Sequence, residues 1–193
     1  MELQNKRGGP GRNGGGSQSE LVFVALGGLG EIGKNCYLYG TGPEDARQWL
    51  MVDLGITFPE GDFEPGVDVI LPDLRFVEDE HINLVGIVLT HAHEDHIGAL
   101  LELYPRLNVP IYATPFTAGL LRAKQVEFAG HIRPDMHVVK PGSAFKVGPF
   151  DLEFVEVAHS IPEPQGLVIK TGEGTVYHTG DWKVDATPYI GTD

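Results

Sequence analysis

Cysteine is almost missing from this chain of 193 residues, which contains only Cys36. An internal disulfide is therefore excluded, and so is a zinc site built on cysteine ligands. Long apolar runs are missing too. No stretch reaches the roughly 18 consecutive apolar residues of a membrane-spanning helix, and the polar start lacks the apolar core of a secretory signal peptide. We expect a cytoplasmic protein in which Cys36 packs as a small apolar side chain.

Basic side chains are scarce, because only 14 lysines and arginines accompany 27 aspartates and glutamates, which leaves a net charge of −13. Taken alone, this excess of negative charge argues against a nucleic-acid partner. Bound metal cations, or basic surface outside this chain, would remove that objection. Residues 1–19 are rich in glycine and nearly free of apolar side chains, so we expect a disordered tail there.

The rest of the chain has enough apolar residues, 41% of the total, to form a sizeable core. These residues occur in short runs between glycines and prolines, and the runs are rich in β-branched and aromatic side chains, as strands are. The predicted strands are residues 21–26, 35–40, 49–55, 84–90, 109–114, 150–158, 167–172 and 174–181. Amphipathic patterns predict helices over 96–107 and 115–130. Together they indicate one α/β layered domain with mixed sheets.

Three histidines and two carboxylates gather in residues 91–96 (HAHEDH), between a predicted strand and a predicted helix. Crowded imidazoles would repel one another when protonated and would lose hydration when buried. A divalent cation removes both costs, and neutral imidazole together with carboxylate suits zinc. His91 and His93 reach one ion from an extended loop, whereas Asp95 and His96 would face a second ion nearby. A polar helix cap is the simpler alternative, but a cap needs only one such residue.

His159 and Asp181 also stand in loops at the ends of predicted strands, where ligands of a site at a sheet edge would lie. Ser160 could contact a substrate phosphate or be an ordinary loop hydroxyl. His178 lies on a strand, where it either packs in the core or contacts a ligand, and Glu94 is expected to point away from the metals. The remaining histidines are expected at the surface: His81, His131 and His137.

A glycine pattern at residues 28–33 (GLGEIG) fits the dinucleotide-binding fingerprint G-x-G-x-x-G, and Asp53 follows about twenty residues later. That fingerprint requires a helix directly after the glycines. Residues 34–40 (KNCYLYG) have strand character instead, so we expect a hairpin connection near the metal edge of the sheet.

The HAHEDH motif resembles the His-x-His-x-Asp-His signature of the metallo-β-lactamase superfamily. The resemblance implies an αββα sandwich with two mixed sheets, incomplete in this chain, in which loops along one edge hold the metals. The implied ligands form a first site of His91, His93 and His159 and a second site of Asp95 and His96, with Asp181 bridging both. Asp53 matches an early aspartate that orients a ligand rather than binding metal.

Within the superfamily the chain is similar to the ribonuclease J family of the β-CASP nuclease branch. The matching segments are LGGLGEIGKN (26–35), VDLGITFPE (52–60), VDVILPDL (67–74), GIVLTHAHEDHIGAL (86–100), AHSIPEPQGLVIKT (158–171) and YHTGDWKVD (177–185). This resemblance implies zinc-dependent hydrolysis of RNA phosphodiester bonds, both from the 5′ end and internally, in mRNA decay and rRNA maturation.

The resemblance also implies the cofactors and partners. Two Zn²⁺ ions would hold a hydroxide that Asp95 and Asp181 position for attack on phosphorus, and Mn²⁺ or Mg²⁺ could assist. RNA with a 5′-monophosphate is the implied substrate. A homo-oligomer is implied through regions outside this chain, and no membrane partner is expected.

The second metal site lacks one ligand, because no histidine follows His178. In the ribonuclease J family this histidine comes from a later segment, after the β-CASP domain. We therefore expect residues 20–193 to be the N-terminal part of a metallo-β-lactamase domain, without the β-CASP and C-terminal regions and with little activity alone. Two other functions stay open: a small-molecule hydrolase of the same fold, such as a thioesterase or lactonase, and a metal-stabilised fragment without catalysis.

Overall fold

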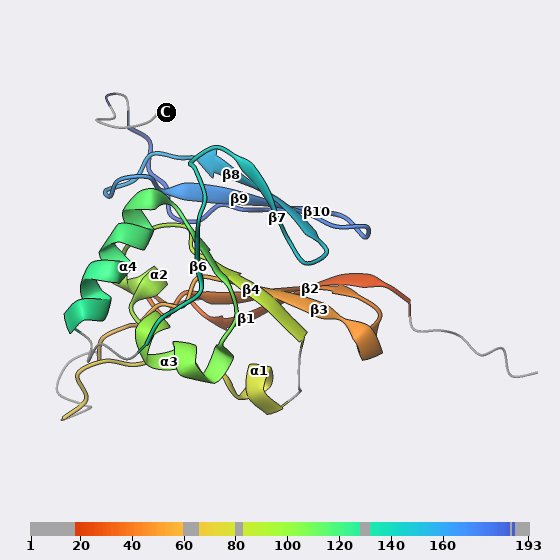
Figure 1. The fold of residues 1–193 in the computed structure, drawn as a ribbon, viewed down its shortest axis with the longest axis horizontal. Coiled ribbons are helices and arrows are strands. Elements are labelled where there is room, and N and C mark those ends of the chain that lie inside the picture. Colours follow the sequence, from red (N-terminus) through yellow and green to blue (C-terminus); the bar gives the residue numbers. More distant parts are fainter. Residues whose placement is uncertain (1–17, 60–65, 80–82, 128–131, 186, 188–193) are drawn as a thin grey trace, which may run out of the picture.

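Two β-sheets lie face to face, and helices cover the outer side of the first sheet (Figure 1). The computed structural model describes residues 18–59, 66–79, 83–127, 132–185 and 187. All but the last two residues of the predicted tail, 1–19, lie outside the described residues. The predicted α/β class and the layered sheets are confirmed.

The first sheet has six strands in the order of the sequence. They are β1 (Glu20–Gly27), β2 (Cys36–Gly42), β3 (Gln48–Val52), β4 (Asn83–Val88), β5 (Ile111–Ala113) and β6 (Met136–Val138). The strands β1, β2 and β3 pair antiparallel, whereas β3 to β6 pair parallel, so this sheet is mixed as predicted. A 3₁₀ turn, η1 (Glu44–Ala46), connects β2 to β3.

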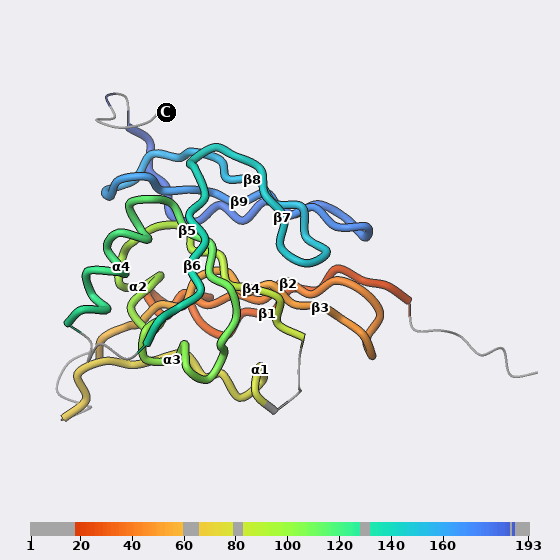
Figure 2. The backbone as a smooth tube through the Cα atoms, in the orientation of Figure 1, coloured from red at the N-terminus to blue at the C-terminus, as the bar shows by residue number. Residues whose placement is uncertain are grey.

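The second sheet has four strands in the order β10, β9, β8, β7. Their bounds are β7 (Ala144–Val147), β8 (Phe150–Glu156), β9 (Gln165–Lys170) and β10 (Thr175–His178). Every pair in it is antiparallel, so the expectation of two mixed sheets is wrong for this sheet. Short turns reverse the chain between β7 and β8, at Gly148, and between β9 and β10, whereas the longer segment 157–164 joins β8 to β9. Figure 2 shows the chain passing from β6 of the first sheet to β7 of the second sheet.

Alternation along the strands of the first sheet divides the core into two layers. Leu38, Met51 and Ile87 face the helices and pack with side chains such as Leu100 and Leu121. The neighbouring residues of the same strands face the second sheet instead. They form the layer between the sheets, which contains Tyr39, Leu50, Val52, Val88, Phe150, Leu152, Phe154, Leu167 and Ile169. Both faces of this sheet are therefore buried at its centre, which explains the nearly continuous apolar runs of β3 and β4.

Within the described part of the chain, four α-helices accompany the first sheet: α1 (Arg75–Asp79), α2 (Glu94–Ile97), α3 (Leu100–Leu107) and α4 (Pro115–Glu127). The prediction of one helix over 96–107 is wrong, because α2 and α3 are separate. The backbone explains the break: the carbonyl of Asp95 accepts the amide of Asn35, and Ala99 donates to Leu54 instead of to residue 95. Among the described residues, no helix is both long and apolar enough to cross a membrane.

Candidate metal centre

The segment after β4 carries most of the candidate ligands. His91 is fully buried, and His93 stands in extended conformation directly before α2. The backbone carbonyl of His93 accepts the amides of His96 and Ile97, which fixes the first turn of the helix. Asp95 and His96 therefore project from a helix start, while His91 and His93 project from the loop before it.

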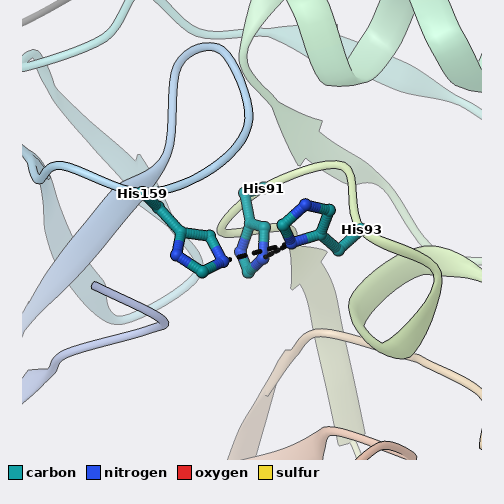
Figure 3. Close-up of side chains that lie close together, drawn as sticks. All are labelled: His91, His93 and His159. Atoms are coloured by element: carbon teal, nitrogen blue, oxygen red, sulfur yellow. Dashed lines mark hydrogen bonds between the residues drawn. The ribbon is translucent and has the colours of Figure 1, made fainter. Parts of the chain in front are cut away.

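Three imidazoles meet in a first ligand group, which consists of His91, His93 and His159. His91 Nε2 lies 3.0 Å from His93 Nδ1, and His159 Nε2 lies 3.2 Å from the same nitrogen. Figure 3 shows His91 and His93 on one loop and His159 reaching them from the other sheet. All three ligand atoms lie within 4.8 Å of one another, a separation that could hold a metal ion. The structure thus brings together residues that are 66 positions apart in the sequence.

A second ligand group consists of His91, His96 and Asp181, whose ligand atoms also lie within 4.8 Å of one another. Asp181 Oδ1 is 3.5 Å from His96 Nε2, and its Oδ2 is 3.8 Å from His159 Nε2. One carboxylate thus faces both groups. Asp95 stands beside the second group rather than inside it, with Oδ2 3.6 Å from His96 Nε2.

Asp53 and Thr90 form buried hydrogen bonds beside the candidate ligand His96. Asp53 is completely buried, and its Oδ2 lies 2.7 Å from His96 Nδ1. Both carboxylate oxygens of Asp53 also accept hydrogen bonds from Thr90, one from the backbone amide and one from the hydroxyl, each at 2.8 Å. Because Nδ1 of His96 faces Asp53, its Nε2 is left to face the second ligand group. Asp53 therefore lies where a residue that orients a ligand should lie.

Electrostatics differ between the two ligand groups. Burial lowers the pKa of His91 to about 3, and burial also lowers the pKa of His159, so these two imidazoles of the first group are neutral at pH 7. Burial acts on His96 in the same direction, but the charge of Asp53 and the hydrogen bonds to Asp181 and Asp53 together raise its pKa to about 10. The hydrogen bond to His96 lowers the pKa of Asp181 to about 2, although partial burial opposes this. A cation at the second group would therefore displace a proton from His96.

The donor set fits a zinc-like ion, because neutral imidazole nitrogens and carboxylate oxygens are its usual ligands without cysteine. The histidine side of the centre is closed, since His91 and His96 are almost fully buried. The carboxylate side is open: the side chains of Asp181 and Asp95 are 45% and 34% exposed. A substrate would therefore approach the centre from the carboxylate side.

The other predicted residues take different positions. The ring of His178 packs against the rings of Tyr37 and Tyr39, and its Nδ1 is 3.0 Å from the Tyr39 hydroxyl. These contacts join His178 to two tyrosines and not to a candidate ligand. Ser160 is exposed beside His159. Glu94 forms an ion pair with Lys124 on α4, which turns it away from the centre as expected. His137 is exposed on β6 and pairs with Asp135, whereas His81 and His131 lie outside the described residues.

The glycine-rich segment forms a hairpin connection. β1 and β2 pair antiparallel, and no helix follows the glycines, so the dinucleotide-binding alternative is wrong and the hairpin prediction is confirmed. The connection also lies at the metal edge, because the side-chain amide of Asn35 is 3.0 Å from His96 Nε2. Sequence reasoning missed Asn35 and assigned no role to Thr90. Neither titrates, and the only available signal was their position beside the glycine loop and the HAHEDH motif.

Comparison with known proteins agrees with this fold. A family model described as the beta-lactamase superfamily domain matches residues 63–192, about two thirds of the chain. The chain belongs to the beta-lactamase superfamily. The solved metallo-beta-lactamase fold protein YhfI from Bacillus subtilis superimposes with a TM-score of 0.57 at 17% identity, over 88% of this chain and 65% of that one. At this identity the likeness concerns the fold, and it confirms the predicted metallo-β-lactamase fold.

Particular relatives are more similar in sequence. The chain is 55% identical to ribonuclease J of Sinorhizobium meliloti over 172 residues, and 44% identical to ribonuclease J of Mycolicibacterium smegmatis over 174 residues. Each match covers 89% of this chain but 30% of the relative. The chain thus spans about a third of the length of these curated relatives. The predicted resemblance to the ribonuclease J family is confirmed.

Proposed function

We propose that this chain carries the metal centre of a metal-dependent ribonuclease that hydrolyses RNA phosphodiester bonds. The observation that carries the proposal is the position of Asp181, with one carboxylate oxygen near His96 of the second ligand group and the other near His159 of the first. Such a carboxylate between two sets of imidazoles is suited to a pair of divalent ions. The 55% identity to a ribonuclease J supports RNA as the substrate.

Each ligand would have a distinct task. His91, His93 and His159 would hold one Zn²⁺, Asp95 and His96 a second, and Asp181 would contact both. When bound, the two ions supply a water of lowered pKa and positive charge to neutralise the phosphate, and Mn²⁺ or Mg²⁺ could serve in assays. Asp53 keeps the His96 ring oriented, and the open carboxylate side lets Asp95 and Asp181 position the attacking water. The bound cations would also offset the repulsion between RNA and a chain of net charge −13.

The proposal includes the finer expectations from the family. RNA would be cleaved both from its 5′ end and internally, in mRNA decay and rRNA maturation in the cytoplasm, by a homo-oligomer assembled through regions outside residues 20–193. Ser160, exposed beside His159, is the candidate contact for a substrate phosphate. His178 would contribute only by packing against Tyr37 and Tyr39 near the centre.

Cleavage of labelled RNA by a zinc-loaded enzyme of the relatives' full length, which contains this chain, tests the proposal. Asp181→Asn keeps the shape of the side chain but removes its charge, and we expect it to abolish hydrolysis. Asp151→Asn is the matched control, because Asp151 is an exposed residue of β8 that pairs with Lys146 on the surface. Full activity of Asp181→Asn would contradict the proposal. Hydrolysis of a thioester or a lactone in place of RNA would favour the small-molecule hydrolase.

Substrate choice needs a second assay. A paired time course on RNAs of one sequence, with either a 5′-monophosphate or a 5′-triphosphate, compares the two ends directly. We expect faster degradation of the monophosphorylated RNA. Equal rates would remove the 5′-end preference from the proposal but leave internal cleavage in place.

A further inference from the structure

Asn35 joins the hairpin connection to the start of α2. It is the last residue before β2, and its backbone amide donates to the carbonyl of Asp95 at 3.0 Å. Its own carbonyl accepts the amide of Gly55 at 3.0 Å. The backbone of Asn35 is therefore held on both sides, between two loops that are distant in the sequence.

The side chain of Asn35 reaches two candidate ligands at once. Its amide nitrogen Nδ2 donates to Asp95 Oδ2 at 3.3 Å and lies 3.0 Å from His96 Nε2. His96 Nε2 is the nitrogen on the ligand side of the ring, since Nδ1 faces Asp53. The side chain of Asn35 thus lies against His96, a member of the second ligand group, and against Asp95 beside it.

Tyr37 decides which way the amide of Asn35 faces. The Tyr37 hydroxyl donates to Asn35 Oδ1 at 2.8 Å and also lies 3.2 Å from the carbonyl of Gly28. Because Oδ1 is turned toward Tyr37, Nδ2 must face Asp95. Gly28 leaves the space for this contact: at its φ of +79°, a Cβ would lie 2.4 Å from both Asn35 Oδ1 and the Tyr37 oxygen.

We propose that Asn35 is a positioning residue for the second metal, which holds the side chain of Asp95 in place beside His96 through an amide that Tyr37 orients. A free carboxylate can rotate about its χ angles, and a hydrogen bond to Oδ2 restrains that rotation before the ion arrives. Asn35 makes no such bond to His93 or His159 among the described interactions, so its effect is confined to the second group. This inference rests on the metal-binding part of the proposed function.

Metal titration of the purified, metal-free full chain tests the inference. Co²⁺ is added stepwise, and visible absorption reports the ligands of each ion, while circular dichroism reports folding. We expect Asn35→Ala to weaken the second binding step roughly 10- to 100-fold, the usual effect of losing a partner of a metal ligand. The first step should stay within about twofold of the unaltered chain. Tyr37→Phe should give a smaller loss in the second step.

Tyr39→Phe is the matched control, because the hydroxyl of Tyr39 lies 3.0 Å from His178 Nδ1 and does not reach Asn35 among the described bonds. It should change neither step. An unchanged second step in Asn35→Ala, an equal loss in both steps, or a single step in the unaltered chain would each overturn the inference. If Asn35→Ala does not fold, Tyr37→Phe decides alone: a selective loss in its second step supports the inference, and no loss overturns it.

Parallel RNA cleavage assays separate this inference from the proposed function. A selective loss of the second metal in Asn35→Ala, together with no RNA cleavage when the unaltered residues are assayed within an enzyme of the relatives' full length, would support the positioning role and contradict the nuclease. RNA cleavage by that full-length enzyme, together with normal metal binding by Asn35→Ala, would support the nuclease and contradict the positioning role.

Discussion

Asp53 Oδ2 and His96 Nδ1 lie 2.7 Å apart, and both side chains are almost fully removed from solvent. Burial alone would raise the pKa of Asp53, but the charge and hydrogen bond of His96 lower it, so the carboxylate stays ionised. Asp53 has a positive φ of 62°, which ends β3 and turns its side chain under the HAHEDH segment. The pair therefore connects the end of one central strand to the ligands that follow the next.

We expect Asp53→Ala to destabilise the metal-free protein by roughly 3 to 5 kcal/mol, since the substitution leaves His96 and Thr90 without their buried partner. The free energy of unfolding in urea measures the effect. Asp151→Ala serves as the control, because Asp151 is exposed and its surface ion pair contributes little. A loss below about 1 kcal/mol for Asp53→Ala would show that the buried pair is not needed for folding.

Gly55 lies so close to the start of α2 that no side chain fits. A Cβ on Gly55 would be 1.6 Å from the carbonyl oxygen of Asp95. We expect Gly55→Ala to cost at least about 3 kcal/mol of unfolding free energy, the upper range of overpacking. Gly119→Ala is the matched control: Gly119 lies within α4 with open space around it, and alanine there should be neutral or stabilise by up to about 1 kcal/mol. Equal thermal stability of the two variants would contradict this packing.

Cys36 is completely buried at the start of β2, and this burial raises the pKa of its thiol well above the usual range. Since only the thiolate reacts with iodoacetamide, the folded protein should react very slowly, and raising the pH from 7 to 9 should not accelerate the reaction. The same protein unfolded in guanidinium should react quickly and faster at the higher pH. Rapid labelling of the folded chain would place Cys36 outside the core.

His159 completes the first ligand group, so its removal should lower metal retention. After dialysis against a weak chelator, we expect about one zinc per unaltered chain, because the first group has three imidazoles and the carboxylate of Asp181 within reach. We expect His159→Ala to lose most of that zinc and the thermal stabilisation that comes with it. His137→Ala, an exposed histidine on β6, is the control and should retain it. Equal zinc content in the two variants would exclude His159 as a ligand.

The strands of the two cores could be predicted because their apolar runs are strong. β1 to β5 and β8 to β10 each overlap a predicted strand. Four short elements were missed: η1 with three residues, α1 with five, β6 with three and β7 with four. Stretches this short carry too few apolar positions for a period to be recognised, and their pairing with neighbouring strands decides their structure.

Candidate ligands could be predicted because histidine and carboxylate in a dense motif have few other uses. The structure brings together His91 and His93 of the motif and His159 from a strand end, but which residues support them could not be read from the chain. Thr90 and Asn35 act through hydrogen bonds to partners 37 and 60 positions away. Such contacts depend on how loops pack, and neither residue type signals them. The break between α2 and α3 has the same origin, since partners outside the helix occupy its backbone groups.

The first ligand group draws on both sheets, with His91 and His93 after β4 and His159 after β8. During synthesis from the N-terminus, a ribosome releases the two early histidines while the chain of the second sheet is still missing. A metal ion can therefore be fully enclosed only after β8 has paired and carried His159 to the others. Capture of an ion by all three imidazoles would therefore follow assembly of the second sheet, and metal supply would act on chains that have already paired β8.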